Sequence, residues 1–339
     1  GQTASLDNAG TVSGGNGGIA NSSSHGAGGV GIVGAASGGI SIVNSGMIAG
    51  GLSGDGVTRA NGVAVCGSTT RLEIRAGSTT NGNVVVQGGG TNNVLALGGA
   101  TDGSVNIGNL VASHTGFTAY EKTGSSTWTL SGPGNQNWTI NEGTLAGNAA
   151  SMAGNLTFAT GAGTRGVVFQ GLGIYSGTIS GDGSFTLAGV GGSSLTLANA
   201  QSYTGMTTIN AGTLRMGVAN ALTASAGIQL TAGSWDLNGY DQTVKGLSGD
   251  SGTDVTLGSA TLTVDNAGNV SYRGSISGTG GLTKTGAGIF TLRGANTYSG
   301  ATNVASGFMR IGPGGSLLNS TTINISNGAH FNVVAPSAL

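Results

Sequence analysis

Apolar and polar residues alternate over short runs along the whole chain, and Gly, Asn, Asp or Ser bounds each run. In the run 71–75, Leu72 and Ile74 alternate with Arg71, Glu73 and Arg75. Because the side chains of a β-strand point alternately to its two faces, the two apolar residues share one face and the three charged residues share the other. The same pattern occurs at 235–237, 261–265 and 290–293. It predicts half-buried strands that recur about every eight to twelve residues, as in a sandwich, a propeller or a solenoid.

Internal similarity favours the solenoid among these three architectures. The stretch 282–312 has two more divergent copies, at 185–217 and 120–145. Each copy is about thirty residues of strand and turn without a segment for a crossover helix, so stacking the strands of successive units is the economical arrangement. The chain is therefore predicted to be all-β, as a parallel β-solenoid.

Composition supports this fold class and narrows the partners. Gly accounts for 71 of the 339 residues and charged residues for 7%, so no window of a dozen residues is free to form a stable helix. The hydrophobic share of 37% is enough for a core, and the length favours either two domains or an elongated repeat. A net charge of −1 provides no field for nucleic acid or an anionic membrane, so we expect neither as a partner. The most membrane-like stretch, 26–43, is broken by glycines and is not expected to insert.

The repeat units resemble the autotransporter-associated β-strand repeat. In 282–312, a Leu-Thr-Lys-Thr-Gly opening leads through Gly-Ala-Asn-Thr-Tyr-Ser-Gly to a close in which Phe308-Met309 stands where Thr-Leu is usual. Residues 235–249 resemble the link between such repeats, and the resemblance extends over most of 40–335. It implies a right-handed parallel β-helix, exported across the outer membrane of a Gram-negative bacterium through a C-terminal β-barrel.

The resemblance also sets the expected organisation of the chain. We expect one continuous β-helix passenger fragment over 1–339, with Gly-rich N-terminal rungs at 1–116 and autotransporter-associated repeat rungs at 117–339. The first residues lack the features of a signal peptide, and 334–339 end in mid-pattern, so we expect the signal peptide and the barrel to be absent. The low number of charged residues suits export, because few charges resist threading of the chain through a membrane. The single cysteine suits it too, because no internal disulfide can lock a folded state early.

One short string matches a protease. Gly249-Asp250-Ser251-Gly252 is the peptide around the nucleophile of chymotrypsin-like serine proteases. Similar strings at 52–56 and 179–183 indicate instead a turn that this chain uses repeatedly. A triad would also need a general base beside Ser251, whereas His25 and His114 lie in unrelated Gly-rich segments. We predict a turn.

Cofactor and metal signals are equally weak. The glycines of 29–34 satisfy the dinucleotide-binding string, but the following residues cannot form the helix whose N-terminus would hold the pyrophosphate. His25, His114 and His330 stand far apart without carboxylates at ligand spacing, and a lone histidine is normally a surface or cap residue. We therefore expect no cofactor, no metal and no catalytic site.

Parallel β-helices include polysaccharide-active enzymes, so an enzyme is the rival from another class. Such a site needs carboxylates and basic groups clustered on one face. The nearest group here is Arg71, Glu73 and Arg75, whose alternation we explain by solvent exposure.

Two residue types leave alternatives open. Trp128, Trp138 and Trp235 lie in alternating runs beside Leu or Ile, so we expect core packing, although exposed rings would be able to stack on a sugar. The run around Cys66 leaves its orientation undecided; we favour a buried thiol over an exposed one.

We therefore expect a passenger of a bacterial cell-surface autotransporter adhesin, anchored to the outer membrane by the absent barrel. It is expected to mediate aggregation or biofilm formation by binding copies of itself on neighbouring cells, or to attach to a host surface protein, matrix or glycan. The alternatives are a structural stalk that displays another domain and a polysaccharide-active enzyme. Which face is adhesive, and whether it is glycosylated, stay open.

Overall fold

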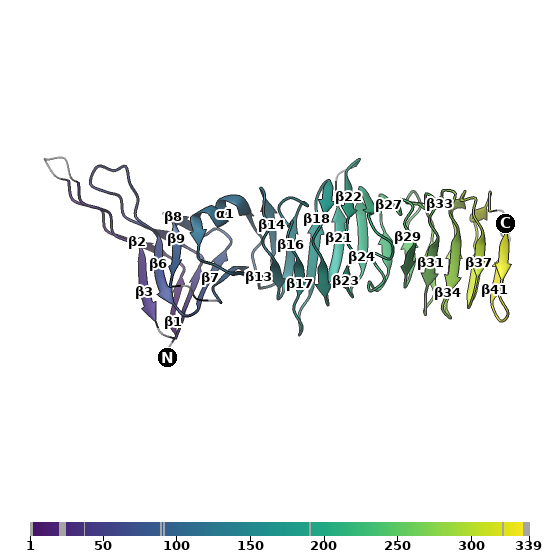
Figure 1. Ribbon diagram of the computed structural model, residues 1–339, viewed down its shortest axis with the longest axis horizontal. Helices are drawn as coiled ribbons and strands as arrows, with labels where there is room; N and C mark the ends of the chain where they lie inside the picture. The colour runs from purple at the N-terminus through teal and green to yellow at the C-terminus, as the bar shows by residue number, and fades with distance from the viewer. Residues whose placement is uncertain are drawn as a thin grey trace. The chain divides into compact units, whose positions relative to one another are not determined.

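The computed structural model describes residues 3–19, 25–36, 38–88, 90, 92–189, 191–320 and 322–334. It divides into a first unit, Gly1–Leu145 with Gly161–Thr164, and a second unit, Ala146–Thr160 with Arg165–Leu339. Strands make up about 48% of the chain, and parallel stacked coils form a β-solenoid of about 13 turns (Figure 1). The prediction of an all-β parallel solenoid is confirmed. The residues 335–339, on which the expectation of a mid-pattern end partly rests, lie outside the described part.

In the first unit, each coil contributes a strand to several parallel sheets. One sheet pairs successive coils in the order β1, β4, β7, β10, β13 and β15, and a second runs β3, β6, β9 and β12. The bounds are β1 (Ala4–Asn8), β2 (Thr11–Ser13), β3 (Ile32–Ala36), β4 (Ile40–Asn44), β5 (Met47–Ala49), β6 (Val63–Gly67), β7 (Thr70–Arg75), β8 (Thr79–Asn81), β9 (Val84–Gln87), β10 (Val94–Gly98), β11 (Gly103–Asn106), α1 (Ile107–Ser113), β12 (His114–Thr115), β13 (Ala119–Lys122), β14 (Thr127–Ser131) and β15 (Trp138–Ile140). Strand β16 (Gly143–Gly147) begins in this unit and ends in the second.

The second unit has shorter and more regular coils. Its main sheet runs β18, β21, β24, β26, β29, β32, β35, β38 and β41, and two more sheets run β19 to β33 and β28 to β40. The bounds are β17 (Leu156–Phe158), β18 (Arg165–Phe169), β19 (Gly173–Tyr175), β20 (Ile179–Gly181), β21 (Ser184–Ala188), β22 (Ser194–Leu197), β23 (Ser202–Tyr203), β24 (Thr207–Ala211), β25 (Thr213–Met216), β26 (Ile228–Leu230), β27 (Ser234–Asp236), β28 (Gln242–Val244), β29 (Leu247–Gly249), β30 (Asp254–Thr256), β31 (Leu262–Asp265), β32 (Val270–Tyr272), β33 (Ser275–Ser277), β34 (Leu282–Thr285), β35 (Ile289–Leu292), β36 (Ala295–Asn296), β37 (Thr302–Val304), β38 (Phe308–Ile311), β39 (Ser316–Leu317), β40 (Ile323–Ile325) and β41 (His330–Val333).

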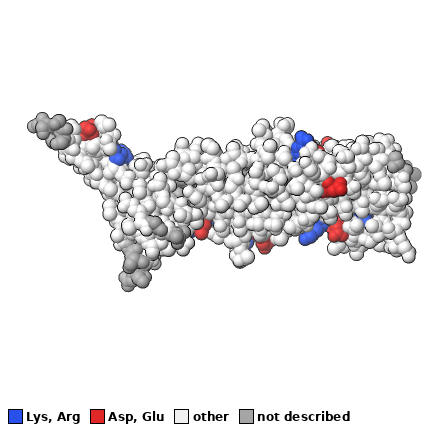
Figure 2. All heavy atoms as spheres, in the orientation of Figure 1, with Lys and Arg blue, Asp and Glu red and all other residues white. Residues whose placement is uncertain are grey.

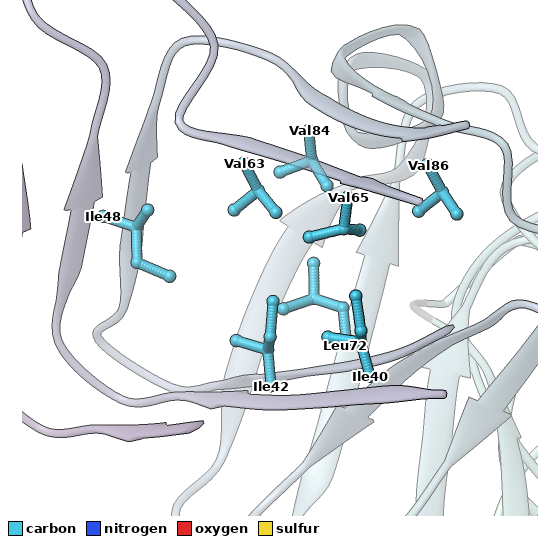
Figure 3. Packing of buried hydrophobic residues seen from close by; sticks show 8 residues of the cluster. All are labelled: Ile40, Ile42, Ile48, Val63, Val65, Leu72, Val84 and Val86. Atoms are coloured by element: carbon cyan, nitrogen blue, oxygen red, sulfur yellow. The ribbon is translucent and has the colours of Figure 1, made fainter. Parts of the chain in front are cut away.

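The core lies inside each coil, where the apolar half of every strand points. In the first unit, Ile, Val and Leu side chains from facing sheets meet across the coil (Figure 3): Ile40, Ile42, Ile48, Val63, Val65, Leu72, Val84 and Val86. In the run 71–75 Leu72 is buried, and Ile74 packs partly buried against the same cluster. In the second unit Leu292 is buried and Arg293 is exposed. The two faces predicted from the alternation are therefore confirmed at these positions, whereas Thr291, which the pattern of 290–293 placed outward, is buried at 7% exposure.

Polar residues of the repeat motif are buried too, and those of 296–302 are hydrogen-bonded to one another or to the backbone. Tyr298 Oη lies 2.6 Å from Thr302 Oγ1, which lies 2.9 Å from Ser320 Oγ in the next coil. Asn296 accepts a hydrogen bond from the Ile276 amide at 3.1 Å and donates to the carbonyl oxygens of Gly294 and Ser316. An unpaired buried polar group destabilises a fold, so these partners explain why the motif repeats polar residues at inward positions.

The buried lysine of the repeat motif is also hydrogen-bonded to the backbone around it. Lys284 is fully buried, and its Nζ donates to the carbonyl oxygens of Thr285, Gly286 and Ser306. In the first unit, Lys122 Nζ donates to the carbonyl oxygens of Thr123, Gly124 and Glu142, at 2.6–3.1 Å. Each ammonium group thus joins a turn of its own coil to the next coil.

A short helix, α1, was not expected from the sequence. Its first turn is capped by Asn106, whose side-chain oxygen accepts from the Asn109 amide at 3.1 Å. Ile107 and Leu110 are three positions apart, so they share one helical face and are both buried. The glycine content excludes long helices, but a capped helix of 7 residues forms even with Gly108 inside it.

Candidate functional site

The clearest surface feature of the second unit is a column of uncharged polar side chains on the sheet β28, β31, β34, β37 and β40. Strand register places equivalent positions side by side in successive coils. The column, which we call the Thr/Asn ladder, consists of Thr243, Thr263, Thr283, Asn303 and Asn324.

The ladder arises from alternation within strands of nearly constant spacing. In the first four strands the neighbours of each ladder residue, such as Leu262 and Val264, point inward and are buried, so the residue between them points outward. In β40 the neighbours Ile323 and Ile325 are exposed. Hydrogen bonds run along the column, from Asn324 Nδ2 to Asn303 Oδ1 at 2.8 Å and from Asn303 Nδ2 to Thr283 Oγ1 at 3.4 Å. These partners are 20 or 21 positions apart, which is one coil. The face therefore offers hydroxyl and amide groups at the spacing of stacked strands, about 4.8 Å.

Two other sheets of the second unit carry different columns. On the sheet that starts at β19, Arg215 and Asp236 are adjacent in register, and their charged groups lie 3.5 Å apart. On the main sheet, Thr208, Gln229 and Ser248 form a polar column. Charged residues are isolated spots on the face shown in Figure 2, as expected from 11 basic and 12 acidic residues in the chain.

The charged group on β7 is a paired network. Arg71 lies 2.5 Å from Glu121 Oε2 and 3.6 Å from Glu73, while Arg75 Nε lies 3.0 Å from Glu73 Oε1. The carboxylate of Glu73 is only 14% exposed, so explaining this alternation by solvent exposure alone was incomplete. The arginines lie beside the carboxylates on neighbouring positions of the same face, and mutual pairing accounts for all of them.

The structure assigns the tryptophans to the core. Trp128, Trp138 and Trp235 are 3%, 1% and 0% exposed, which confirms the packing that the alternation predicted. Trp138 lies against Tyr120, with ring centroids 5.5 Å apart. With such burial, none of the three rings has a face open for stacking on an extended glycan.

Cys66, in contrast, is exposed, so the favoured burial was wrong. Val63 and Val65 are buried at 1% and 2%, and the alternation along β6 turns Ala64 and Cys66 away from the core. The register of the two valines was the signal that would have decided its direction.

Ser251 lies in a turn, as predicted. It follows β29 and precedes β30, and Thr253 Oγ1 closes the turn on the Asp250 carbonyl oxygen at 2.7 Å. Gly252 has φ +85°, a conformation that favours glycine. The Gly-rich string 29–34 runs into strand β3, and no helix begins there to hold a pyrophosphate.

The histidines have three different environments. His25 is exposed, and His330 is exposed and stacks on Phe308 at 4.5 Å between centroids. His114 caps the C-terminal end of α1 and is buried, 7% exposed. Within the described residues, no three His, Cys, Asp or Glu side chains lie together as metal ligands would. Among the same residues, none of the helices is long and apolar enough to cross a bilayer.

Comparisons with known proteins agree with this architecture. The passenger-associated-transport repeat matches residues 121–146, 190–216 and 282–311, which are the three copies found by internal similarity. Over 211 residues the chain is 34% identical to the Adhesin BmaC autotransporter of Brucella suis biovar 1 (strain 1330); the match covers 58% of this chain and 6% of that protein. The chain thus spans a small part of its relative. No solved structure matches this chain.

Proposed function

We propose that this chain, in which three stretches match the passenger-associated-transport repeat, is part of an adhesin on the bacterial surface that aggregates cells by binding copies of itself. The similarity to an autotransporter adhesin and the repeat matches support an adhesin-type passenger, and they point away from catalysis. Outer-membrane anchoring through a barrel elsewhere in the protein belongs to the same proposal.

The observation that carries the proposal is the Thr/Asn ladder. Its five members are uncharged, so two copies brought together meet little Coulomb repulsion along it. Each member carries a hydroxyl or amide group that can donate and accept hydrogen bonds. A second ladder running antiparallel would therefore present matching groups at the same spacing.

Binding through the Thr/Asn ladder is expected to be weak for one pair of passengers and strong for many pairs that act together. A hydrogen bond between neutral groups contributes about 1 kcal/mol net, so contacts through the five ladder members would give a single pair of passengers an affinity no tighter than about 0.1 mM. Display of many copies raises the effective strength by roughly 10²–10⁴ without any new contact. Aggregation should therefore require dense display.

The test displays the complete passenger on a non-adherent bacterium and scores settling, biofilm formation and host-cell binding together. A triple variant, Thr243→Ala with Thr263→Ala and Thr283→Ala, should slow settling strongly, whereas each single substitution should have little effect. The matched control replaces Thr208, Gln229 and Ser248 on the main sheet by Ala and should settle like the unmodified passenger.

Other outcomes identify other functions. Cells that stay dispersed but adhere to host cells or matrix would replace self-association by heterotypic adhesion. Cells that neither settle nor adhere would favour a structural stalk that displays another domain. Equal loss of settling in both triple variants would remove the ladder as the adhesive face.

A further inference from the structure

One element of the first unit, the helix α1, does not belong to the stacked strands. It lies between β11 and β12 in the chain and packs on β11, β12 and β14. A helix of 7 residues that contains Gly108 has little stability of its own, because so few residues cannot offset the cost of helix nucleation. Its position therefore depends on its caps and on the burial of Ile107 and Leu110.

The C-terminal cap of α1 is His114, which is buried beside the same apolar interior. Its amide donates to the Leu110 carbonyl oxygen, and its side chain is 7% exposed. Leu110, His114 and Trp128 all line a cavity of about 370 Å³ in the first unit. Because α1 packs on β14, which carries Trp128, departure of the helix would uncover Ile107 and Leu110 and open the cavity at the Trp128 wall.

The imidazole of His114 fits its place in the neutral form. Ser113 Oγ donates its single hydrogen to the carbonyl oxygens of the α1 turn, Asn109 at 2.9 Å and Leu110 at 3.2 Å. The contact of 2.9 Å between Ser113 Oγ and His114 Nδ1 then has the imidazole N–H as donor. Nε2 is buried and has no hydrogen-bond partner among the described residues. Protonation would add an N–H at Nε2 where no acceptor lies, together with a charge that is shielded from water.

The charged groups nearby do not compensate for this burial. The strands β9, β11 and β14, which pack on β12 or α1, contain no ionisable side chain. The charged residues on the cavity wall besides His114 are Arg75 and Asp102. Asp102 Oδ1 accepts from the Thr127 amide at 2.7 Å, and Arg75 Nε lies 3.0 Å from Glu73 Oε1, so both are engaged elsewhere.

Burial therefore dominates the titration of this histidine. It lowers the pKa of His114 from 6.5 to about 4, and a backbone hydrogen bond to Leu110 acts in the opposite direction. The ring is thus neutral in the closed structure at neutral pH, where it supports the end of the helix.

From this geometry we propose that α1 is an acid-sensitive lid: when His114 takes up a proton, the helix leaves β11 and β14, and the apolar surface beneath it opens to water. The open form satisfies the imidazolium, because both of its N–H groups then donate to water. The proposal concerns the first unit alone and does not rest on self-association through the Thr/Asn ladder.

The expected size of the effect follows from proton linkage. In the open form His114 is in water and has its ordinary pKa of 6.5, so between pH 6.5 and 4 the open form binds a proton that the closed form does not. The opening constant, which is the ratio of open to closed form, should rise about tenfold per pH unit over this range and about a hundredfold in total. Above pH 6.5 it should not change with this group.

The test measures amide hydrogen exchange of the 339-residue chain between pH 7 and 4, corrected for the intrinsic exchange rate at each pH. The amides of 111–114, which are hydrogen-bonded at the end of the helix, should gain about a hundredfold in opening constant. At pH 4 they should also open far more often than the amides of β10 and β13. Equal opening constants in all three segments would show that the proton is taken up when the whole unit unfolds, which contradicts a local lid.

Variants identify the group that titrates. His114→Asn keeps a donor for Ser113 and does not titrate, so the opening of α1 should lose its pH dependence. A changed level of opening at every pH in this variant leaves the test intact, because the slope with pH is the readout. Asp102→Asn keeps an acceptor for the Thr127 amide and removes the nearest carboxylate of the cavity wall; it should retain the hundredfold rise.

The matched control is His330→Asn. His330 is exposed in the second unit, so this variant should open α1 like the unmodified chain at every pH. The proposal is overturned if the opening of α1 does not change between pH 6.5 and 4, if His114→Asn keeps the slope, or if Asp102→Asn abolishes it.

Discussion

At the scale of single residues, the direction of a side chain decides how much a substitution costs. Leu292 is fully buried in the second unit and its neighbour Arg293 is exposed. Leu292→Asp would place a carboxylate without a partner in the core and should lower the free energy of unfolding by about 4 kcal/mol. Arg293→Asp should change it by less than about 0.5 kcal/mol. Chemical denaturation measures both, and equal losses would contradict the assignment of faces.

The buried lysine of the repeat is a second residue with a definite expected cost. Lys284→Ala removes the donor of three carbonyl oxygens and leaves a cavity, so we expect a loss of about 3 kcal/mol. Lys284→Leu keeps most of the volume and should cost about 1 kcal/mol, because the second copy of the repeat has Leu187 at the matching position. There, Ser193 Oγ lies beside the turn glycine Gly212, as Lys284 Nζ lies beside Gly307. Denaturant unfolding measures the free energy of unfolding of both variants. A larger loss of stability in Lys284→Leu than in Lys284→Ala would contradict this prediction.

His114 predicts how stability depends on pH. Its folded-state pKa is lowered to about 4, so between pH 6.5 and 4 the unfolded chain binds a proton that the folded chain does not. Stability should be unaffected by this group above pH 6.5 and fall by about 3 kcal/mol as the pH drops to 4. The measurement compares the unfolding free energy of the native chain with that of His114→Asn from pH 7 to 4. If the difference between the two chains stays constant, the histidine is not the titrating group.

At the scale of elements, turns depend on glycine where coils approach each other. Gly307 has φ +68° and faces the carbonyl oxygen of Gly286 in the previous coil, so a Cβ has no room. Gly252 has φ +85° with open space around it. We expect Gly252→Ala to cost about 1 kcal/mol from backbone strain alone and Gly307→Ala to cost about 3 kcal/mol or more. Similar losses of melting temperature in both variants would show that neighbouring coils can move apart to accommodate a Cβ at residue 307.

Strands were predictable from the sequence because each one carries its own two-residue period. Leu72 and Trp235 needed only their neighbours to be assigned inward, and the internal copies then indicated stacking. The helix α1 was missed because a capped helix of 7 residues gives little periodicity, and tertiary burial of Ile107 and Leu110 stabilises it.

The sites were less predictable than the strands, since they depend on which coils become neighbours. The Thr/Asn ladder requires the register between strands, and a single strand shows just one outward threonine. The cavity beside His114 is lined by residues that lie between 74 and 128 in the chain. Turns separate these residues in the sequence, and the sequence alone does not predict how the turns bring them together. From the sequence, His114 was expected to be a surface residue or a helix cap. It is the C-terminal cap of α1, and its side chain is buried.

At the scale of the whole molecule, stability is close to a sum over neighbouring coils. Each coil of the second unit pairs with the one before and the one after it, as β35 pairs with β32 and β38. In such a repeat, the energy of a coil depends on its own packing and on its two interfaces. Damage in one coil should therefore remain local when the remaining coils are stable on their own.

Hydrogen exchange of the core variant tests this directly. In Leu292→Asp, amide protection should fall first in β32, β35 and β38, because these strands share the damaged layer. Amides of β4 and β7 in the first unit should keep the exchange rates of the unmodified chain, since their partners are β1, β10 and each other. Loss of protection in β4 and β7 together with β35 would mean that the chain unfolds as one cooperative block, and the nearest-neighbour description would then fail.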